Sequence, residues 1–185
     1  MPKKRRRILI CLGLAFAILV LSIKPSLKML FPLAYEDLIL GYTHEYELSS
    51  SLAEAIIWCE SRYRPEAVSP MGACGLMQLT PATFRELCSE LGMLPNSDIH
   101  DPATNIRCGT FYLQKLLKRF SALPTALAAY NAGIGNVTKW LADPRYSHDG
   151  KTLHTIPFAE TRRYVKRVLA VQEIYEKLYP KKGDS

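Results

Sequence analysis

Apolar residues recur at every third or fourth position along most of the chain, which is the spacing of amphipathic helices. No alternation of apolar and polar residues is long enough to predict a strand, and no internal repeat is present. The first stripe follows a Ser-x-x-Glu sequence at residues 51–54, which is typical of a capping box. Pro65 predicts where this helix ends. The pattern as a whole predicts an all-α fold.

Several later helix starts are marked by proline at the first helical position. Thr80-Pro81 and Asp101-Pro102 add a capping side chain before the proline, and their helices are expected to end near Gly92 and Phe120. Shorter helices are predicted over 124–132 and 136–141, and a long one over 157–178. The apolar stripe of the long helix consists of Val165, Val168, Val171, Tyr175 and Leu178.

The N-terminal segment has a different pattern, because it is apolar on all sides. Sixteen uncharged residues, 8–23, follow the basic run 3–7 and precede Lys24. As a helix they span about 24 Å, somewhat less than a hydrocarbon core of roughly 30 Å. We interpret 8–24 as an uncleaved transmembrane signal-anchor, since no small-residue cleavage site follows it. A cleaved signal peptide is the alternative.

This interpretation predicts both topology and organisation. The excess of Lys and Arg before the apolar segment places the N-terminus in the cytoplasm. A single-pass protein of the cell membrane, with its folded body outside the cytoplasm, is therefore expected. The expected parts are a cytoplasmic basic tail at 1–7, the anchor at 8–24, a connector at 25–47 and a helical domain at 48–180.

Composition narrows the class of protein. The 185 residues are 48% hydrophobic and 22% charged, which fits one packed domain and excludes a disordered or collagen-like chain. Most of the net charge of +7 comes from residues 3–7, so nucleic-acid binding is not indicated. The sequence contains no phosphate-binding or dinucleotide-binding glycine motif and no metal-ligand spacing, and we expect neither a cofactor nor a metal.

Glu60 is the first candidate for chemistry. It lies near the C-terminal end of its predicted helix and shares a face with Ile56 and Ile57. Apolar neighbours and the negative end of the helix dipole both raise the pKa of a carboxyl group. A carboxyl that stays protonated near neutral pH is what a general acid needs. The alternative is a solvated glutamate paired with Arg64 at i+4.

Two further segments combine small residues with polar ones. In the loop 69–81, Gly75 allows a close approach of the backbone, and Gln78 is a candidate for binding a neutral polar ligand. Tyr130 and Asn131 close a short helix among alanines. Taken singly, such segments are also typical of a tight connection and of a helix end whose tyrosine hydroxyl bonds the backbone.

Three motifs taken together, in this order, are much more specific. They are Glu60-Ser61, Gly75-Leu76-Met77-Gln78-Leu79-Thr80-Pro81 and Ala129-Tyr130-Asn131-Ala132-Gly133, with further matches at Ile156–Val165 and Asp101–Ile106. This set resembles the catalytic domain of soluble lytic transglycosylases, whose fold is akin to goose-type lysozyme. The resemblance covers about 48–178. It implies a lysozyme-like helical catalytic domain at 48–180, behind the transmembrane helix.

The resemblance also implies a substrate and a role for each matching residue. The substrate is peptidoglycan, cleaved at the β-1,4 bond between N-acetylmuramic acid and N-acetylglucosamine. Glu60 is the implied catalytic acid and base. Binding or orienting roles are implied for Ser61 beside Glu60, Gly75, Met77 and Gln78 along the sugar cleft, Tyr130 and Asn131 at the muramoyl unit, and Glu160 with Tyr164 at the edge of the site.

Only one carboxyl group, that of Glu60, lies in a motif at the cleft, and this bears on the mechanism. Most glycosidases use two carboxylates, whereas substrate-assisted enzymes use a group of the substrate itself. On that scheme the N-acetyl carbonyl attacks while Glu60 donates a proton, and Glu60 then acts as a base. Capture by the muramoyl C6 hydroxyl gives a 1,6-anhydromuramoyl end, and capture by water makes the protein a muramidase. A third hypothesis is a non-catalytic peptidoglycan-binding envelope module.

The cysteines leave two possibilities open. Cys11 lies in the apolar segment, and four others lie in the body: Cys59, Cys74, Cys88 and Cys108. Cys59 and Cys74 depart from the family's pattern. An exported domain permits at least one disulfide, and a helical domain with its own core equally permits four buried thiols.

Overall fold

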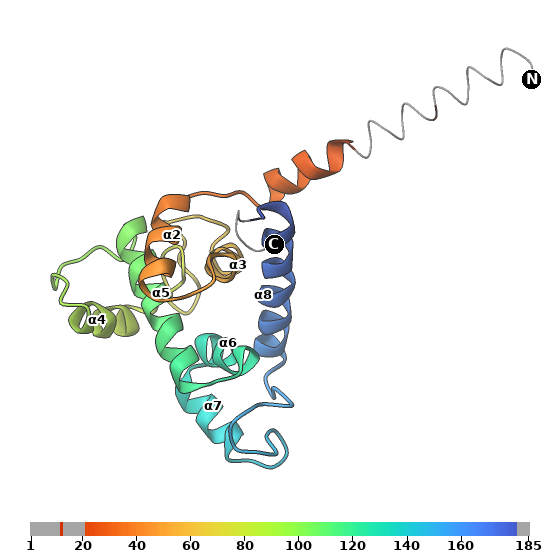
Figure 1. The fold of residues 1–185 in the computed structure, drawn as a ribbon. Helices are drawn as coiled ribbons and strands as arrows, with labels where there is room; N and C mark the ends of the chain where they lie inside the picture. Colours follow the sequence, from red (N-terminus) through yellow and green to blue (C-terminus); the bar gives the residue numbers. More distant parts are fainter. Residues whose placement is uncertain (1–11, 13–20, 181–185) are drawn as a thin grey trace, which may run out of the picture.

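The computed structural model describes residues 12 and 21–180, and these form an all-α body (Figure 1). A helix over 21–30 leads into seven helices: α2 (Glu36–Glu45), α3 (Ser50–Glu60), α4 (Pro81–Glu90), α5 (Pro102–Arg119), α6 (Leu123–Ala132), α7 (Ile134–Leu141) and α8 (Ala159–Leu178). Within the described residues, β structure is limited to isolated bridges that join Cys74 to Val68 and to Leu79. The all-α prediction is confirmed.

Helix α3 is the centre of the main core. Its residues from Ser50 to Trp58 are all buried, as expected of a helix that is apolar nearly all round. It packs along α8, whose predicted apolar stripe from Val165 to Leu178 is buried. Helix α2 also packs on α3, while α6 packs on α5, α7 and α8 (Figure 1). The core therefore centres on the packed pair of α3 and α8, and Glu60 lies at the C-terminal end of α3.

A smaller hydrophobic cluster lies under α4, which packs on α5 and projects from the body (Figure 1). The predicted caps are confirmed at both helices. Thr80 Oγ1 accepts from the Thr83 amide at 3.2 Å, and Asp101 Oδ2 accepts from the Thr104 amide at 2.8 Å. Cluster members are Leu79, Phe84, Leu87, Cys88 and Cys108.

The boundaries of α3 differ from the prediction. The capping box is wrong, because Ser49 is the N-cap and the Ser51 hydroxyl instead donates to Glu176 of α8 at 3.1 Å. The helix ends at Glu60, well before Pro65, since Arg62 and Tyr63 adopt left-handed backbone conformations with φ of 54° and 60°. Because the helix ends there, Glu60 and Arg64 do not form the i+4 pair of a continuous helix.

Part of the predicted connector at 25–47 packs on the helical body. Phe31 is buried and stacks on Trp58 at 4.7 Å between ring centroids, and the Trp58 indole donates to the Leu30 carbonyl at 2.9 Å.

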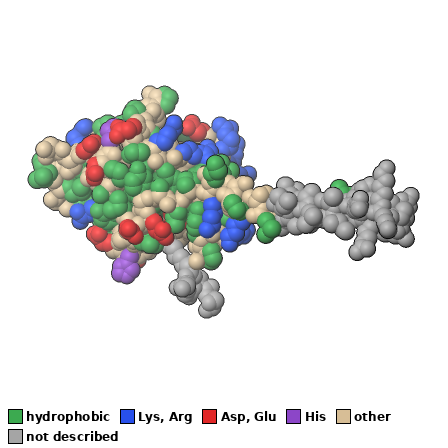
Figure 2. Space-filling view, turned by 90° about the horizontal axis from the view of Figure 1, so that it is seen from above, with side chains coloured by type: hydrophobic (Ala, Val, Ile, Leu, Met, Phe, Trp, Pro, Cys, Tyr) green, Lys and Arg blue, Asp and Glu red, His purple; other side chains and the backbone are tan. Residues whose placement is uncertain are grey.

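Seen from above, hydrophobic side chains gather in the middle of the surface, with charged ones around them (Figure 2). Met29 and Leu30 are among the exposed large hydrophobic residues.

The predicted anchor at 8–24 lies mostly outside the described residues. In the part of the chain that the structure describes, no helix is both long enough and apolar enough to span a membrane.

The four body cysteines are thiols in this structure. The Cys88 and Cys108 sulfurs approach to 3.9 Å between α4 and α5. Burial raises the pKa of Cys59 to about 11 and that of Cys108 to about 12. Buried, protonated thiols of this kind act as small apolar side chains.

Candidate active site

Glu60 is the last residue of α3, and its side chain is half-buried. Burial raises the pKa of its carboxyl from the ordinary 4.5 to about 7. Two neighbours on α8 act in the opposite direction, because the Tyr164 hydroxyl and the Arg167 guanidinium both favour the charged form. The site therefore holds a carboxyl that exchanges its proton near neutral pH.

Two phenols, the buried Tyr164 and the partly buried Tyr130, lie near Glu60 on separate helices. The negative charge of Glu60 contributes to raising the pKa of both Tyr130 and Tyr164, after burial itself. The Tyr164 hydroxyl is buried and has no hydrogen bond of standard geometry, although it lies close enough to Glu60 to lower its pKa. We call Glu60, Tyr130, Tyr164 and Arg167 the Glu60 cluster. It brings together α3, α6 and α8.

The predicted glycine-containing loop, here residues 72–80, is held by Asn105 of α5. The Met77 amide donates to Asn105 Oδ1 at 2.8 Å, and Asn105 Nδ2 donates to the carbonyls of Ile99 and Cys74 at 2.7 and 3.3 Å. Gly75 has φ of +81°, and a Cβ there would lie 2.1 Å from Asn105 Nδ2. Only glycine fits this position, because the backbone at residue 75 lies against the Asn105 side chain. The predicted close approach of the backbone is confirmed.

The glycine loop and the Glu60 cluster are joined by one hydrogen bond. The Tyr130 hydroxyl donates to the Met77 carbonyl at 2.9 Å. This is the backbone partner that a buried tyrosine at a helix end was expected to find. Tyr130 also packs against Tyr112, with 5.4 Å between ring centroids. Its ring therefore sets the spacing between the glycine loop and Glu60.

Three residues implied as substrate contacts have internal partners instead. Met77 has no exposed surface, so its side chain supports the loop rather than lining an open cleft. Ser61 is buried, and its hydroxyl donates to the Ile57 carbonyl at 3.1 Å. The Gln78 amide donates to the carbonyls of Ala67 and Gly75 at 3.0 and 2.9 Å. These side chains fix the shape of the site.

The remaining implied residues lie at its edge. Asn131 and Glu160 are both exposed. Asn131 follows the partly buried Tyr130 on α6, and Glu160 lies one turn before Tyr164 on α8. Phe158, the N-cap of α8, is half exposed and packs edge-on against Trp140 at 4.9 Å between centroids. The start of α8 thus presents polar and aromatic surface near the cluster.

Sequence reasoning missed three residues. Asn105 is a polar side chain on the buried face of an amphipathic helix, which is a signal that could have been used. Gly109 lets Met77 seat, since a Cβ there would lie 2.3 Å from the Met77 sulfur. Arg167 gave no signal, because surface arginines on a helix are common.

The cluster is suited to proton transfer. A carboxyl with pKa about 7 donates a proton and takes one back at neutral pH. Arg167 favours the carboxylate of Glu60 that remains after the proton has been donated. The groups that shift its pKa are a phenol and a guanidinium rather than a second carboxylate. Among the residues described by the structure, no three His, Cys, Asp or Glu side chains are grouped to hold a metal ion.

Comparison with known sequences identifies relatives. The family described as "Transglycosylase SLT domain" matches residues 37–152, and the "Soluble lytic transglycosylase helical domain" matches 155–183. The soluble lytic murein transglycosylase of Escherichia coli K12 is 43% identical over 150 residues, which is 78% of this chain and 23% of the relative. The membrane-bound lytic murein transglycosylase F of Yersinia enterocolitica is 41% identical over 101 residues, covering 51% of this chain and 19% of the relative. The chain thus spans about a quarter or less of these relatives.

Solved structures agree with the fold. The 70-kDa soluble lytic transglycosylase of Escherichia coli superimposes with a TM-score of 0.72 at 38% identity, covering 84% of this chain and 26% of that one. A complex of the 70-kDa soluble lytic transglycosylase with bulgecin A gives a TM-score of 0.73 at the same identity and coverage. An inactive mutant of lytic transglycosylase Slt from Pseudomonas aeruginosa gives 0.72 at 38% identity, covering 82% and 25%. Because the family match covers more than half of its length, this chain belongs to the transglycosylase SLT domain family.

Proposed function

We propose that the protein is a peptidoglycan lytic transglycosylase that cleaves the β-1,4 bond between N-acetylmuramic acid and N-acetylglucosamine and forms 1,6-anhydromuramoyl ends. The observation that carries the proposal is Glu60, a half-buried carboxyl of pKa about 7 at the end of α3, within the Glu-Ser motif of this family. Its setting suits a single acid that later acts as a base.

The first step uses the protonated form of Glu60. The carboxyl donates its proton to the leaving glycosidic oxygen while the substrate's N-acetyl carbonyl attacks the anomeric carbon, so no second protein carboxylate is needed. Arg167 and the Tyr164 hydroxyl favour the carboxylate that remains. They therefore stabilise the site between the two steps.

The second step uses the carboxylate. Glu60 takes the proton from the muramoyl C6 hydroxyl, which attacks the anomeric carbon and expels the N-acetyl oxygen. This hydroxyl belongs to the same ring, so its effective concentration can exceed that of water by orders of magnitude when the geometry is right. Tyr130, Asn131, Glu160 and Tyr164 are proposed to hold the muramoyl unit, with the glycine loop as the opposite support.

We also propose a membrane location, with residues 1–7 cytoplasmic, 8–24 as a signal-anchor and the catalytic domain of 48–180 outside. The basic run followed by an apolar segment supports it. Leu21 and Met29, exposed at 75% and 85%, continue the apolar character towards the body. Fractionation and external protease digestion test the location. A mature protein lacking residues 1–22 would contradict the anchor but not the external domain.

The test of activity is digestion of purified sacculi followed by mass spectrometry of the products. Anhydro products are lighter by one water than hydrolysis products. The Glu60→Gln variant is the control, since its amide cannot donate the proton. Reducing muramoyl ends that incorporate oxygen from labelled water would show a muramidase instead. Binding to sacculi without any cleavage would favour a non-catalytic module.

A further inference from the structure

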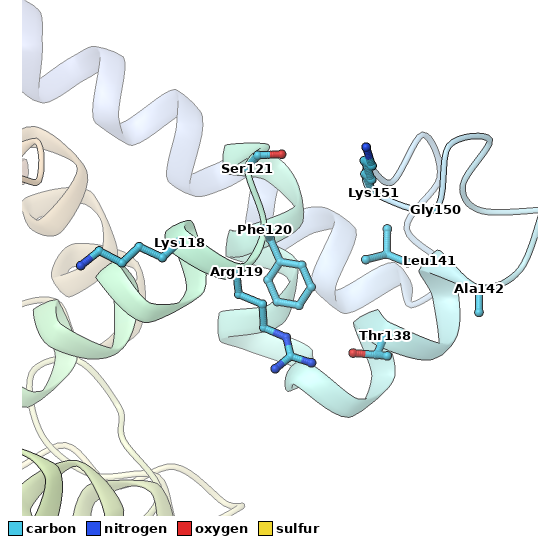
Figure 3. A pocket seen from close by; sticks show the side chains of 9 residues that line it. All are labelled: Lys118, Arg119, Phe120, Ser121, Thr138, Leu141, Ala142, Gly150 and Lys151. Carbon is cyan, nitrogen blue, oxygen red and sulfur yellow. The ribbon is translucent and has the colours of Figure 1, made fainter.

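Two cysteines meet where α4 packs on α5. The neighbours of α5 change along its length. Phe120, at its C-terminal end, lines a pocket with Leu141 of α7 (Figure 3), whereas Cys108, in its first half, faces α4. The Cys88 and Cys108 sulfurs lie 3.9 Å apart, and both side chains are buried in the cluster under α4. This contact between two helices is therefore shielded from water.

The end of α4 fixes the position of Cys88. Gly92 has φ of +63°, and the Met93 amide donates to the Cys88 carbonyl at 2.9 Å, which is the Schellman pattern of a helix end. The Met93 sulfur in turn lies 3.9 Å from the Cys108 sulfur. Both cysteines are thus held by helix backbone rather than by a loop.

The other two body cysteines are placed elsewhere. Cys59 packs against the main core, and Cys74 lies in the glycine loop, where its thiol donates to the Gly72 carbonyl at 3.5 Å. A disulfide bond needs sulfurs about 2.05 Å apart. The separation of Cys88 and Cys108 exceeds this by about 2 Å, which is within the reach of side-chain rotation. The structure therefore favours one pairing among the three that four cysteines allow.

We propose that Cys88 and Cys108 form a disulfide bond that ties α4 to α5 when the domain folds outside the cytoplasm. The bond goes beyond the proposed activity and rests only on the proposed location, because cytoplasmic thiols are kept reduced. The oxidant is the disulfide of a small thiol or of a thiol–disulfide oxidoreductase, RSSR. The Cys88 thiolate attacks RSSR and expels RS⁻, and Cys108 then attacks the Cys88 sulfur and expels the second RS⁻. Each RS⁻ takes up one cysteine proton, so RSSR is reduced to two RSH.

Burial determines when this exchange takes place. Burial, and after it the neighbouring Cys88, raises the pKa of Cys108 to about 12, so the folded protein holds little of the thiolate that exchange needs. The bond is therefore expected to form before α4 closes on α5, while both thiols still contact water.

The bond fixes a helix that has one main partner. Helix α4 projects from the body and packs mainly on α5 (Figure 1). The glycine loop runs directly into α4 at Thr80, so the bond also holds the downstream end of that loop. The cysteines are 20 positions apart. In the chain-entropy model, closing a loop of this size lowers the population with α4 opened by roughly a hundredfold.

Peptide mapping tests the bond directly. The full-length protein is isolated after acid quenching and alkylation with N-ethylmaleimide, and is digested with trypsin without reduction. Tryptic cleavage places the two cysteines in separate peptides, 86–107 and 108–115. We expect these peptides as one linked species, two hydrogens lighter than their sum, with Cys59 and Cys74 alkylated. Alkylation of all four body cysteines, or a bridge to Cys59 or Cys74, would overturn the proposal.

Refolding separates the pairing from the location. The reduced, denatured full-length chain is refolded in neutral detergent with reduced and oxidised glutathione and mapped in the same way. The same linked peptides are expected. If they form here while the isolated protein has free thiols, the bond is absent in the cell and the proposed external location is contradicted. If they form in neither protein, the pairing itself is wrong.

Variants test whether the bond holds α4. The rate of tryptic cleavage at Arg85, within α4, is compared in wild type, Cys88→Ala, Cys108→Ala and the double variant. Because either change breaks the same bond, each single variant should be cleaved at least about tenfold faster than wild type, and the double variant within about threefold of the singles. Cys59→Ala, which removes a thiol from α3, should be cleaved as the wild type is. Single-variant effects that multiply in the double variant would show independent packing and no bond.

Discussion

The Glu60 cluster and the glycine loop lie side by side but are built in opposite ways. In the loop, the polar atoms that Asn105 meets are paired at 2.7–3.3 Å, and Gly75 leaves no space for another atom. In the cluster, burial keeps a carboxyl near its titration point, and the Tyr164 hydroxyl lacks a partner of standard geometry. The polar atoms that Asn105 meets in the loop are thus satisfied, whereas the cluster retains a buried hydroxyl that a substrate can use.

The largest expected effect comes from replacing the Glu60 carboxyl, which donates the proton. Glu60→Gln keeps the size of the side chain but cannot donate, so turnover on sacculi should fall by about 10²- to 10⁴-fold. The measurement is the rate of release of anhydromuropeptides by purified variants. Retention of more than about a tenth of wild-type activity would remove Glu60 from the mechanism.

Next in size is a change to the closely packed glycine loop. Gly75→Ala adds a Cβ 2.1 Å from Asn105 Nδ2 at a φ of +81°, so we expect a loss of about 3–5 kcal/mol in unfolding free energy. Gly72→Ala is a matched control, because φ there is +76° but no atom lies within 4 Å of the added Cβ. Its loss should be about 1–2 kcal/mol. Similar losses in urea unfolding would show that backbone strain alone matters at Gly75.

A third prediction uses Glu60 as a reporter of stability. Its pKa is about 7 in the folded protein and near 4.5 when unfolded, so the folded state binds more protons between these values. Stability from this group is fully present below pH 4.5 and is lost as the pH rises through 7. Glu60→Gln stays neutral and should gain up to about 3 kcal/mol over wild type at pH 8, and almost nothing at pH 4. A difference in Tm independent of pH would contradict the raised pKa.

A smaller effect is expected from Tyr164. Its hydroxyl lowers the pKa of Glu60, so Tyr164→Phe should raise that pKa and move the alkaline fall of kcat/KM, near pH 7 in the wild type, upwards by as much as about one pH unit. Tyr63→Phe is the matched control, since its hydroxyl is also buried without a standard hydrogen bond but faces Tyr175. Only Tyr164→Phe should shift the pH profile.

The two regions also differ in how far the sequence predicts them. Local signals predicted the capped starts of α4 and α5 and the buried stripe of α8, because each depends on residues within a turn or two. The pKa of Glu60 is raised in the predicted direction, but the groups around its carboxyl come from α6 and α8. The loop's shape depends on Asn105, 28 residues from Met77. The capping box failed for the same reason, since Ser51 finds a partner 125 residues away. Such tertiary hydrogen bonds leave no periodic signal in the chain.

The smallest effect should come from the bond that joins the two regions. Tyr130→Phe leaves the buried Met77 carbonyl without its donor, which should cost about 1 kcal/mol in unfolding free energy. If the Tyr130 hydroxyl serves only to hold the loop at its distance from Glu60, its loss should disturb the site little, and kcat and KM should both change only slightly. If it also bonds the muramoyl unit, kcat/KM should fall by a further 1–3 kcal/mol in transition-state stabilisation at unchanged Tm. Comparing unfolding and kinetics on the same variant distinguishes a support from a substrate contact.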